Sequence, residues 1–321
     1  MTRVFFTIDT EYSAGMVVRE GRDCRAANFA RSIACETDNG AVGIGYQMDL
    51  FDRHGLAAVF FVDPMPAMLW GVEAISEIVE PIVARGHDVQ LHCHPEWLAL
   101  AGADAILPGR TGRNMKDFGF EEQCRILEYA RDTLVAAGAP APSAFRAGNY
   151  GANDDTLRAL AELGIAYDTS HCPGIAGSDC AISLGAHDTA PVRHAGVIEV
   201  PVGCIAAREG GRRHMQLTAL SAAELADAVR HAVRIGTPSL TLVSHSFELL
   251  SRDRMKINRI VKARFERFCA DLAAMPGASS GTYRDHPPQV AEAAPVLPHS
   301  YARTGWRMAE QALANTLYGA A

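Results

Sequence analysis

Two short runs of the sequence place pairs of titratable residues where they could bind a metal ion. Asp9 and Glu11 follow the apolar run at 4–8, and His92 and His94 lie at the end of a second apolar run. Residues two apart on a strand point to the same side, so each pair can present both side chains together. Two imidazoles and two carboxylates at strand ends are the residue types of a hydrolytic metal site. Short motifs also match by chance, so spacing alone leaves a purely structural role open.

The elements that must position these residues follow from apolar periodicity. We expect strands and helices to alternate, with strands at 3–8, 57–62, 87–92, 142–146, 164–168, 197–202 and 238–244, and helices at 43–54, 72–85, 120–137, 153–163, 221–235 and 254–274. Such alternation indicates parallel strands joined by crossover helices. No GxGxxG motif follows the first strand, which disfavours a dinucleotide-binding sheet. We predict an α/β fold: a (β/α)7-type distorted TIM-like barrel of parallel strands.

In a barrel of this kind the functional groups collect at the carboxyl ends of the strands. The predicted strand ends carry seven titratable residues: Asp9, Glu11, His92, His94, Arg146, Asp168 and His245. Two long segments, 13–42 and 98–119, lack clear periodicity and follow the strands that bear the two pairs. Irregular segments of this length are often functional, so we expect both to form lids or rims at one mouth.

The last part of the chain differs from the rest. We expect a barrel domain at 1–275 and, at 276–321, a Pro- and Ala-rich linker followed by a C-terminal helix. The apolar residues of that helix give it one weak apolar side: Trp306, Met308, Ala309, Leu313 and Leu317. Docking of this helix on its own domain is our interpretation, with a subunit contact as the alternative.

Composition narrows the class of protein. The 321 residues carry a formal net charge of −7, which argues against a nucleic-acid binder held by phosphate contacts. The Lys and Arg residues are dispersed except at 212–214 and 252–267. No secretory signal or membrane-spanning run is visible, and the eight cysteines lack CxxC spacing, which is typical of reduced, cytoplasmic proteins. A homo-oligomer is left open.

Five motifs in order, over roughly residues 3–270, resemble those of the polysaccharide deacetylase family, the metal-dependent carbohydrate esterases that remove N-acetyl groups. The segments that carry the resemblance are Thr7-Ile8-Asp9-Thr10-Glu11, His92-Cys93-His94-Pro95, Phe145-Arg146-Ala147-Gly148-Asn149-Tyr150, Tyr167-Asp168-Thr169-Ser170 and Leu242-Val243-Ser244-His245-Ser246. Two departures stand out. Thr10 replaces the family's second carboxylate, for which Glu11 is the nearest substitute, and the two histidines are closer together than in the family.

The resemblance implies a role for each residue. Asp9 would be the general base, oriented by Arg146, and Glu11, His92 and His94 would hold one divalent metal ion. Nitrogen ligands favour zinc over magnesium or calcium. The backbone N–H of Tyr150 would contribute to an oxyanion hole. His245, oriented by Asp168, would be the general acid.

Three functions remain compatible with these residues. The first is a metal-dependent deacetylase that cleaves a linear amide C–N bond, removing an acetyl or formyl group from a sugar or sugar conjugate. The second is an amidohydrolase that acts on a small amide with the same scaffold. The third is a catalytically silent protein that has lost the metal and binds a sugar or a partner. None of the three involves nucleic acid or an integral membrane segment.

Overall fold

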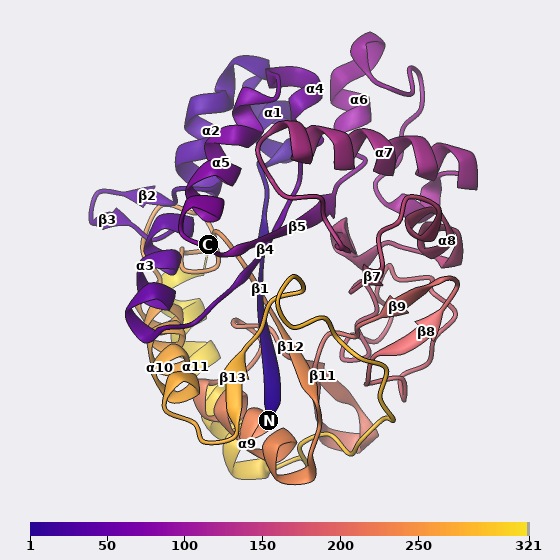
Figure 1. Cartoon of the computed structure of the whole chain (residues 1–321). Helices are drawn as coiled ribbons and strands as arrows, with labels where there is room; N and C mark the ends of the chain where they lie inside the picture. The colour runs from indigo at the N-terminus through magenta and orange to yellow at the C-terminus, as the bar shows by residue number, and fades with distance from the viewer. Residues whose placement is uncertain (320–321) are drawn as a thin grey trace.

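The computed structural model describes residues 1–319 and contains a strongly curled, mostly parallel sheet. Seven parallel strands lie in the order β12-β1-β4-β5-β6-β7-β9. Their bounds are β1 Thr2–Thr10, β4 Val59–Val62, β5 Asp88–Cys93, β6 Ala144–Ala147, β7 Tyr167–Asp168, β9 Val197–Glu199 and β12 Ser239–His245. The predicted α/β fold, a distorted TIM-like barrel built on seven parallel strands, is confirmed (Figure 1).

Irregular backbone covers the free edge of β12. The Gly203 N–H donates to the Thr241 carbonyl at 2.9 Å, and the Val243 N–H donates to the Met215 carbonyl at 2.9 Å. The Leu217 N–H completes the contact by donating to the carbonyl of Val243 at 3.0 Å. The segment that follows β9 therefore reaches back to β12 and closes the curl without a further regular strand.

Six short strands complete the strand inventory of residues 1–319. β13 (Ala278–Ser280) pairs in parallel with the start of β1, and β8 (Val192–His194) pairs antiparallel with β9. Two separate hairpins are β2 (Glu36–Thr37) with β3 (Gly40–Ala41) and β10 (Cys204–Ala206) with β11 (Arg212–His214).

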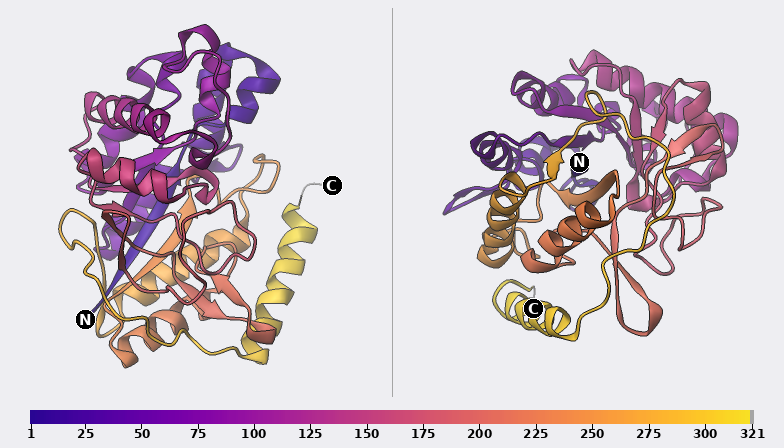
Figure 2. Two further views of the ribbon diagram at one scale, coloured as in Figure 1. Left: turned by 90° about the vertical axis from the view of Figure 1, so that its right-hand side faces the viewer. Right: turned by 60° about the horizontal axis from the view of Figure 1, so that its bottom comes forward.

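Long helices surround the sheet, and the predicted helical segments are present (Figure 2). They are α3 Ile44–His54, α5 Glu73–Ala84, α7 Phe120–Ala136, α8 Asp154–Glu162, α9 Ala222–Ile235 and α10 Arg259–Ala273. Phe6 of β1 shows how the layers join, because its ring contacts Phe51 of α3 and Phe265 of α10 at centroid distances of 5.0 and 5.5 Å. A strand covered on both faces reads as a continuous apolar run, as β1 does.

The segments predicted as irregular contain short helices. Residues 13–42 form α1 (Ala14–Glu20), a 3₁₀ turn and α2 (Arg25–Ser32), and residues 97–101 form α6 (Trp97–Ala101). With α4 (Ala67–Trp70) they gather beyond the carboxyl end of β1 (Figure 1). Trp70 of α4 packs edge-on against Trp97 of α6 at 5.5 Å between ring centroids. The segment at 13–42 is thus more regular than its sequence indicated, whereas most of 102–119 consists of turns and short 3₁₀ pieces.

The C-terminal helix α11 (Tyr301–Tyr318) lies on the domain through its charged side. Arg307 is 6% exposed and pairs with Glu224 of α9 at 3.2 Å, and Arg264 of α10 pairs with Glu310 at 3.3 Å. The apolar residues expected to make the contact are instead exposed, Trp306 at 63% and Leu313 at 53%. Ion pairs rather than apolar packing thus orient this helix. Within residues 1–319, no helix combines the length and the apolar character that crossing a membrane requires.

Candidate active site

The three predicted metal ligands meet at the carboxyl ends of β1 and β5. The Glu11 Oε2 atom lies 2.6 Å from His94 Nε2 and 3.2 Å from His92 Nε2. One ligand atom from each of the three residues falls within 4.8 Å of the others. The two imidazole rings stand edge to face, with centroids 4.9 Å apart. The short spacing of the two histidines therefore does not prevent both Nε2 atoms from facing one carboxylate.

The charges of this cluster are those of a site that a cation would fit. Although burial opposes it, the neighbouring His94 and His92 hold the pKa of Glu11 well below its usual range. Burial also opposes protonation of His94, but Glu11 raises the pKa of that ring to about 10. The charged Glu11 carboxylate thus faces the His94 Nε2 atom, and a divalent ion could interact with both groups.

Neighbouring groups fix both imidazole rings. His92 Nδ1 lies 2.7 Å from the backbone carbonyl of Arg146, an acceptor that holds the proton on Nδ1 and leaves the Nε2 lone pair free. The His94 ring lies flat against Gly148, where an added Cβ would come within 2.6 Å of two ring atoms. Only glycine leaves this space, so the backbone after β6 shapes the position of His94.

Asp9 lies between Arg146 and His245. Its Oδ1 accepts a hydrogen bond of 2.6 Å from Arg146 Nη1, and its Oδ2 lies 3.9 Å from His245 Nε2. The guanidinium of Arg146 is fully buried, 4.4 Å from the centroid of the Phe61 ring. The structure therefore brings together the three residues that the sequence predicted as base, orienting residue and acid.

Glu248, which the sequence analysis missed, pairs with His245. Its Oε1 lies 3.0 Å from His245 Nδ1, and the same carboxylate accepts hydrogen bonds from Gln216 and from Thr218. Burial opposes protonation of His245, but Glu248 and then Asp9 raise its pKa to about 9. The signal in the sequence is a carboxylate three residues after the histidine, in the turn where the Glu248 N–H donates to the His245 carbonyl.

The predicted pairing of His245 with Asp168 was wrong. The Asp168 carboxylate accepts hydrogen bonds from the backbone N–H and the hydroxyl of Ser170, at 2.9 and 2.8 Å. It also lies beside Glu199, and burial together with Asp168 raises the pKa of Glu199 well above its usual range. Asp168 belongs to β7, whereas β12 neighbours β1 in the sheet, so a nearer carboxylate satisfies the histidine.

Tyr150 ends a 3₁₀ turn directly after β6. Asn149 and Tyr150 both have left-handed backbone angles, with φ of 56° and 58°. Such angles in residues other than glycine persist only where the surroundings enforce them, and they cluster at functional sites. The Tyr150 ring packs against Cys172 and Val243 at the edge of the barrel mouth. Its backbone N–H as an oxyanion donor stays a prediction.

A second missed residue, Asp63, follows β4, the strand between the two that carry the metal ligands. Its N–H donates to the Thr10 carbonyl at 3.1 Å, and its Oδ1 accepts from the Met65 N–H at 3.1 Å. Burial raises the pKa of this fully buried carboxyl to about 6. Its Oδ2 atom has no hydrogen-bond partner in residues 1–319, which marks a polar group that the protein alone does not satisfy.

Comparison with known proteins supports the fold. Neither a protein-family model nor a curated protein matches the sequence. Among solved structures, a Mycobacterium smegmatis protein described as a polysaccharide deacetylase superposes with a TM-score of 0.56 and 18% sequence identity, over 88% of each chain. The chain has the polysaccharide deacetylase fold.

Two further solved structures align with most of this chain. A family 4 carbohydrate esterase from Streptomyces lividans, solved with acetate, gives a TM-score of 0.44 and 12% identity over 91% of this chain and 98% of its own. A 4-alpha-glucanotransferase from Thermococcus litoralis gives a TM-score of 0.50 and 9% identity, over 89% of this chain and 40% of its own. Because sequence identities this low bear on the fold alone, the function must be argued from the side chains at the barrel mouth.

Proposed function

We propose that this protein is a metal-dependent hydrolase that removes an N-acyl group, acetyl or formyl, from a sugar or sugar conjugate. One observation supports the proposal above the others. A Glu11, His92 and His94 cluster, a buried Asp9–Arg146 pair and a His245–Glu248 pair surround one barrel mouth. These groups match the needs of amide hydrolysis, which are an activated water, a polarised carbonyl and a protonated leaving nitrogen.

The donor set fits zinc. Two imidazole nitrogens and one carboxylate oxygen are typical ligands of a catalytic zinc, which keeps a further position open. Bound there, a divalent ion supplies Lewis-acid polarisation of the acyl oxygen and makes a water more acidic. Glu11, His92 and His94 would hold the ion, since each presents one ligand atom to the same space.

Asp9 is suited to take a proton from the attacking water. Arg146 occupies its Oδ1 and keeps the carboxylate oriented, while Oδ2 faces the interior of the mouth on the side of His245. Asp9 is therefore placed to act as the base, because Arg146 binds one carboxylate oxygen and leaves the other to face the reacting water. The same contact fixes the position of the carboxylate during proton transfer.

His245 is suited to give a proton to the leaving nitrogen. Its pKa of about 9 keeps the ring protonated at neutral pH, and Glu248 holds its Nδ1 so that Nε2 faces the mouth. Water adds to the acyl carbon, the C–N bond breaks, and the nitrogen leaves as an amine after taking the His245 proton. General acid–base catalysis of this kind contributes typically about 10²–10⁴-fold to a rate.

Release of acetate or formate from N-acylated amino sugars tests the proposal. The zinc-loaded protein should release one equivalent of acid for each amine formed, and the Asp9→Asn variant should not. Hydrolysis of small amides but of no acyl sugar would assign the scaffold to a small-molecule amidohydrolase. Absence of hydrolysis from every substrate, despite bound zinc, would contradict the proposal.

A further inference from the structure

Four arginines line one pocket beside the barrel mouth. The pocket has a volume of about 330 Å³ and is lined by Arg19 of α1, Arg31 of α2, and Arg252 and Arg254 of the loop after β12. We call it the arginine pocket. Ser13, also on its wall, comes two residues after the metal-ligand candidate Glu11. The wall of the pocket therefore includes the chain segment that directly follows the candidate metal ligand Glu11.

Positive charge in the arginine pocket is largely uncompensated. Arg31 pairs with Glu20 at 3.0 Å, but within residues 1–319 no carboxylate lies at ion-pair distance from Arg252, Arg254 or Arg19. The one carboxylate on the wall, Asp253, turns its Oδ1 to the Ser251 hydroxyl at 2.6 Å and to the Met255 N–H at 3.0 Å. Three guanidinium groups thus share a small space in a chain whose net charge is −7.

Arg254 is held in place before any ligand arrives. Its Nη1 donates to the Ser32 hydroxyl at 2.9 Å, and its guanidinium carbon lies 3.8 Å from the centroid of the Phe247 ring. That ring in turn packs against His245, at 5.2 Å between centroids. The backbone of Arg254 has a φ of 59°, an angle that residues other than glycine adopt only when the surroundings enforce it. The loop therefore fixes a guanidinium one aromatic ring away from the proposed acid.

We propose that the arginine pocket binds a phosphate group of the substrate, so that the acyl sugar carries a phosphate or diphosphate ester. This inference rests on the proposed function. A guanidinium presents two parallel N–H donors that match phosphate oxygens, and a cluster of them favours a doubly charged group. The reacting centre itself is rich in carboxylates, Asp9, Glu11 and Glu248, and would repel an anion that lacked its own cationic site. The pocket would recognise the phosphate itself, and the group attached to the far side of that phosphate could be a nucleoside or a lipid.

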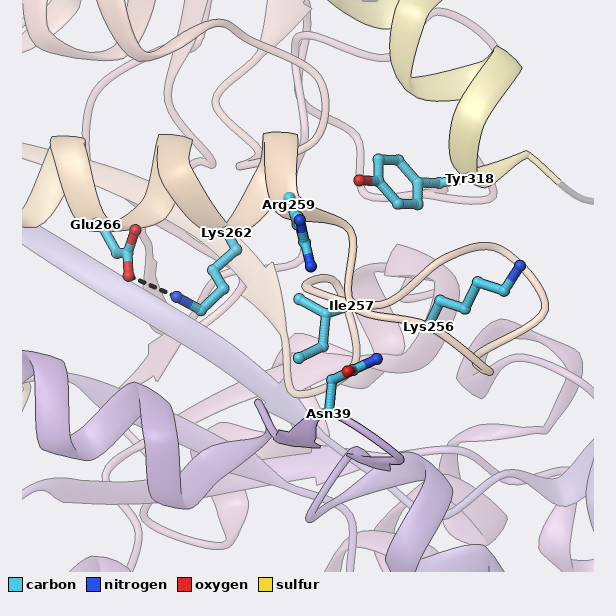
Figure 3. A pocket seen from close by; sticks show the side chains of 7 residues that line it. All are labelled: Asn39, Lys256, Ile257, Arg259, Lys262, Glu266 and Tyr318. Atoms are coloured by element: carbon cyan, nitrogen blue, oxygen red, sulfur yellow. Dashed lines mark hydrogen bonds and ion pairs between the residues drawn. The ribbon is translucent and has the colours of Figure 1, made fainter.

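A matched control variant lies in the same part of the chain. Arg259 is exposed, has no carboxylate at ion-pair distance within residues 1–319, and lines a different pocket of about 540 Å³ together with Lys256 and Lys262 (Figure 3). In that pocket Lys262 is already paired with Glu266 at 2.7 Å. Arg259→Gln therefore removes one exposed positive charge without touching the arginine pocket.

Calorimetric titration with inorganic phosphate tests binding without reference to activity. We expect Arg254→Gln and Arg252→Gln each to raise the Kd for phosphate at least tenfold, and Arg259→Gln to change it less than twofold. Thermal unfolding of each variant verifies the fold, and the exposed Arg252 keeps the test valid if Arg254→Gln is unstable. Phosphate affinity that survives in both arginine-pocket variants, as it would for binding at the metal, overturns the proposal. The proposal is also overturned if Arg259→Gln is the only variant that loses affinity for phosphate.

Substrate choice gives the second test. We compare kcat/KM for N-acetylglucosamine, its 1-phosphate, its nucleoside diphosphate conjugate and its isoprenoid diphosphate conjugate. We expect the wild-type protein to prefer at least one phosphate ester over the neutral sugar by tenfold or more. In Arg252→Gln this preference should fall below threefold. That result supports the phosphate site, and the preferred ester identifies the source of the phosphate. Equal hydrolysis of neutral and phosphorylated sugars, or preference for a carboxylated sugar, overturns the phosphate site while the proposed function stands. Phosphate binding through Arg252 and Arg254 without any hydrolysis contradicts the proposed function while the phosphate site stands.

Discussion

Replacement of Glu248 by glutamine tests which carboxylate controls His245. Burial disfavours the charged imidazole, yet Glu248, followed by Asp9, raises its pKa from the ordinary 6.5 to about 9. That interval corresponds to roughly 3 kcal/mol in favour of the protonated ring. Without the Glu248 charge we expect the pKa to fall towards 6.5. If the pKa falls to 6.5, the protonated fraction at pH 8 should drop about thirtyfold, whereas at pH 6 the ring stays mostly protonated.

The assay is the pH dependence of kcat/KM for an N-acetyl sugar, with the histidine titration followed in parallel by NMR. The wild-type rate should fall as pH rises through about 9, and in Glu248→Gln this fall should begin at least one pH unit lower. Asp168→Asn is the control, because the Asp168 carboxylate accepts hydrogen bonds from Ser170 and does not contact His245. In this variant the fall in rate at alkaline pH should occur at the same pH as in the wild type. If the fall in rate at alkaline pH shifts in Asp168→Asn and not in Glu248→Gln, the pairing of His245 with Glu248 is refuted.

The same pair predicts a pH-dependent stability. Because folding raises the pKa of His245, its contribution to the free energy of unfolding is complete below about 6.5 and is lost as pH rises through about 9. Urea unfolding should therefore show Glu248→Gln to be less stable than wild type at pH 6, with the difference smaller at pH 10. A difference that grows with pH would contradict the pairing.

Three further changes have expected outcomes. Asp9→Asn should lower kcat by at least about 10²-fold with zinc still bound. It should also lower the free energy of unfolding in urea by on the order of 3–5 kcal/mol, because it leaves the fully buried Arg146 without its charge partner. Gly148→Ala should weaken zinc binding by about 10–100-fold in a chelator competition, since the new Cβ would displace the His94 ring; unchanged affinity would argue against His94 as a ligand. Arg307→Ala should lower the free energy of unfolding by roughly 3–5 kcal/mol, as it breaks the buried ion pair that holds α11, and no loss of stability would show that pair to be unimportant.

The strands and long helices could be predicted from the sequence because their signals are local. A strand covered on both faces has a mostly apolar centre, as β1 does between Val4 and Ile8, and a helix on the sheet must be apolar on one side. The residues at strand ends could be named for the same reason. Glu11 and His94 meet as expected because each lies at or just beyond the end of a strand in the barrel.

The errors arose where the outcome depends on which segments become neighbours. His245 selects Glu248 because the turn after β12 brings that carboxylate close, whereas β7, which carries Asp168, is not adjacent to β12 in the sheet. Helix α11 has the predicted period, but the buried pair of Arg307 with Glu224 turns its apolar side outward. Short helices such as α1 carry too few turns for periodicity to reveal them.

Zinc titration of chelator-treated protein, followed by acetate release from an N-acetyl sugar, tests the central claim most directly. Our account predicts no hydrolysis before zinc is added, a rise in rate with added zinc, and saturation at one equivalent, because one triad of Glu11, His92 and His94 holds the ion. His94→Ala should require a far higher zinc concentration for any activity. Hydrolysis that persists after chelation, or that zinc never elicits at any concentration, would contradict the account.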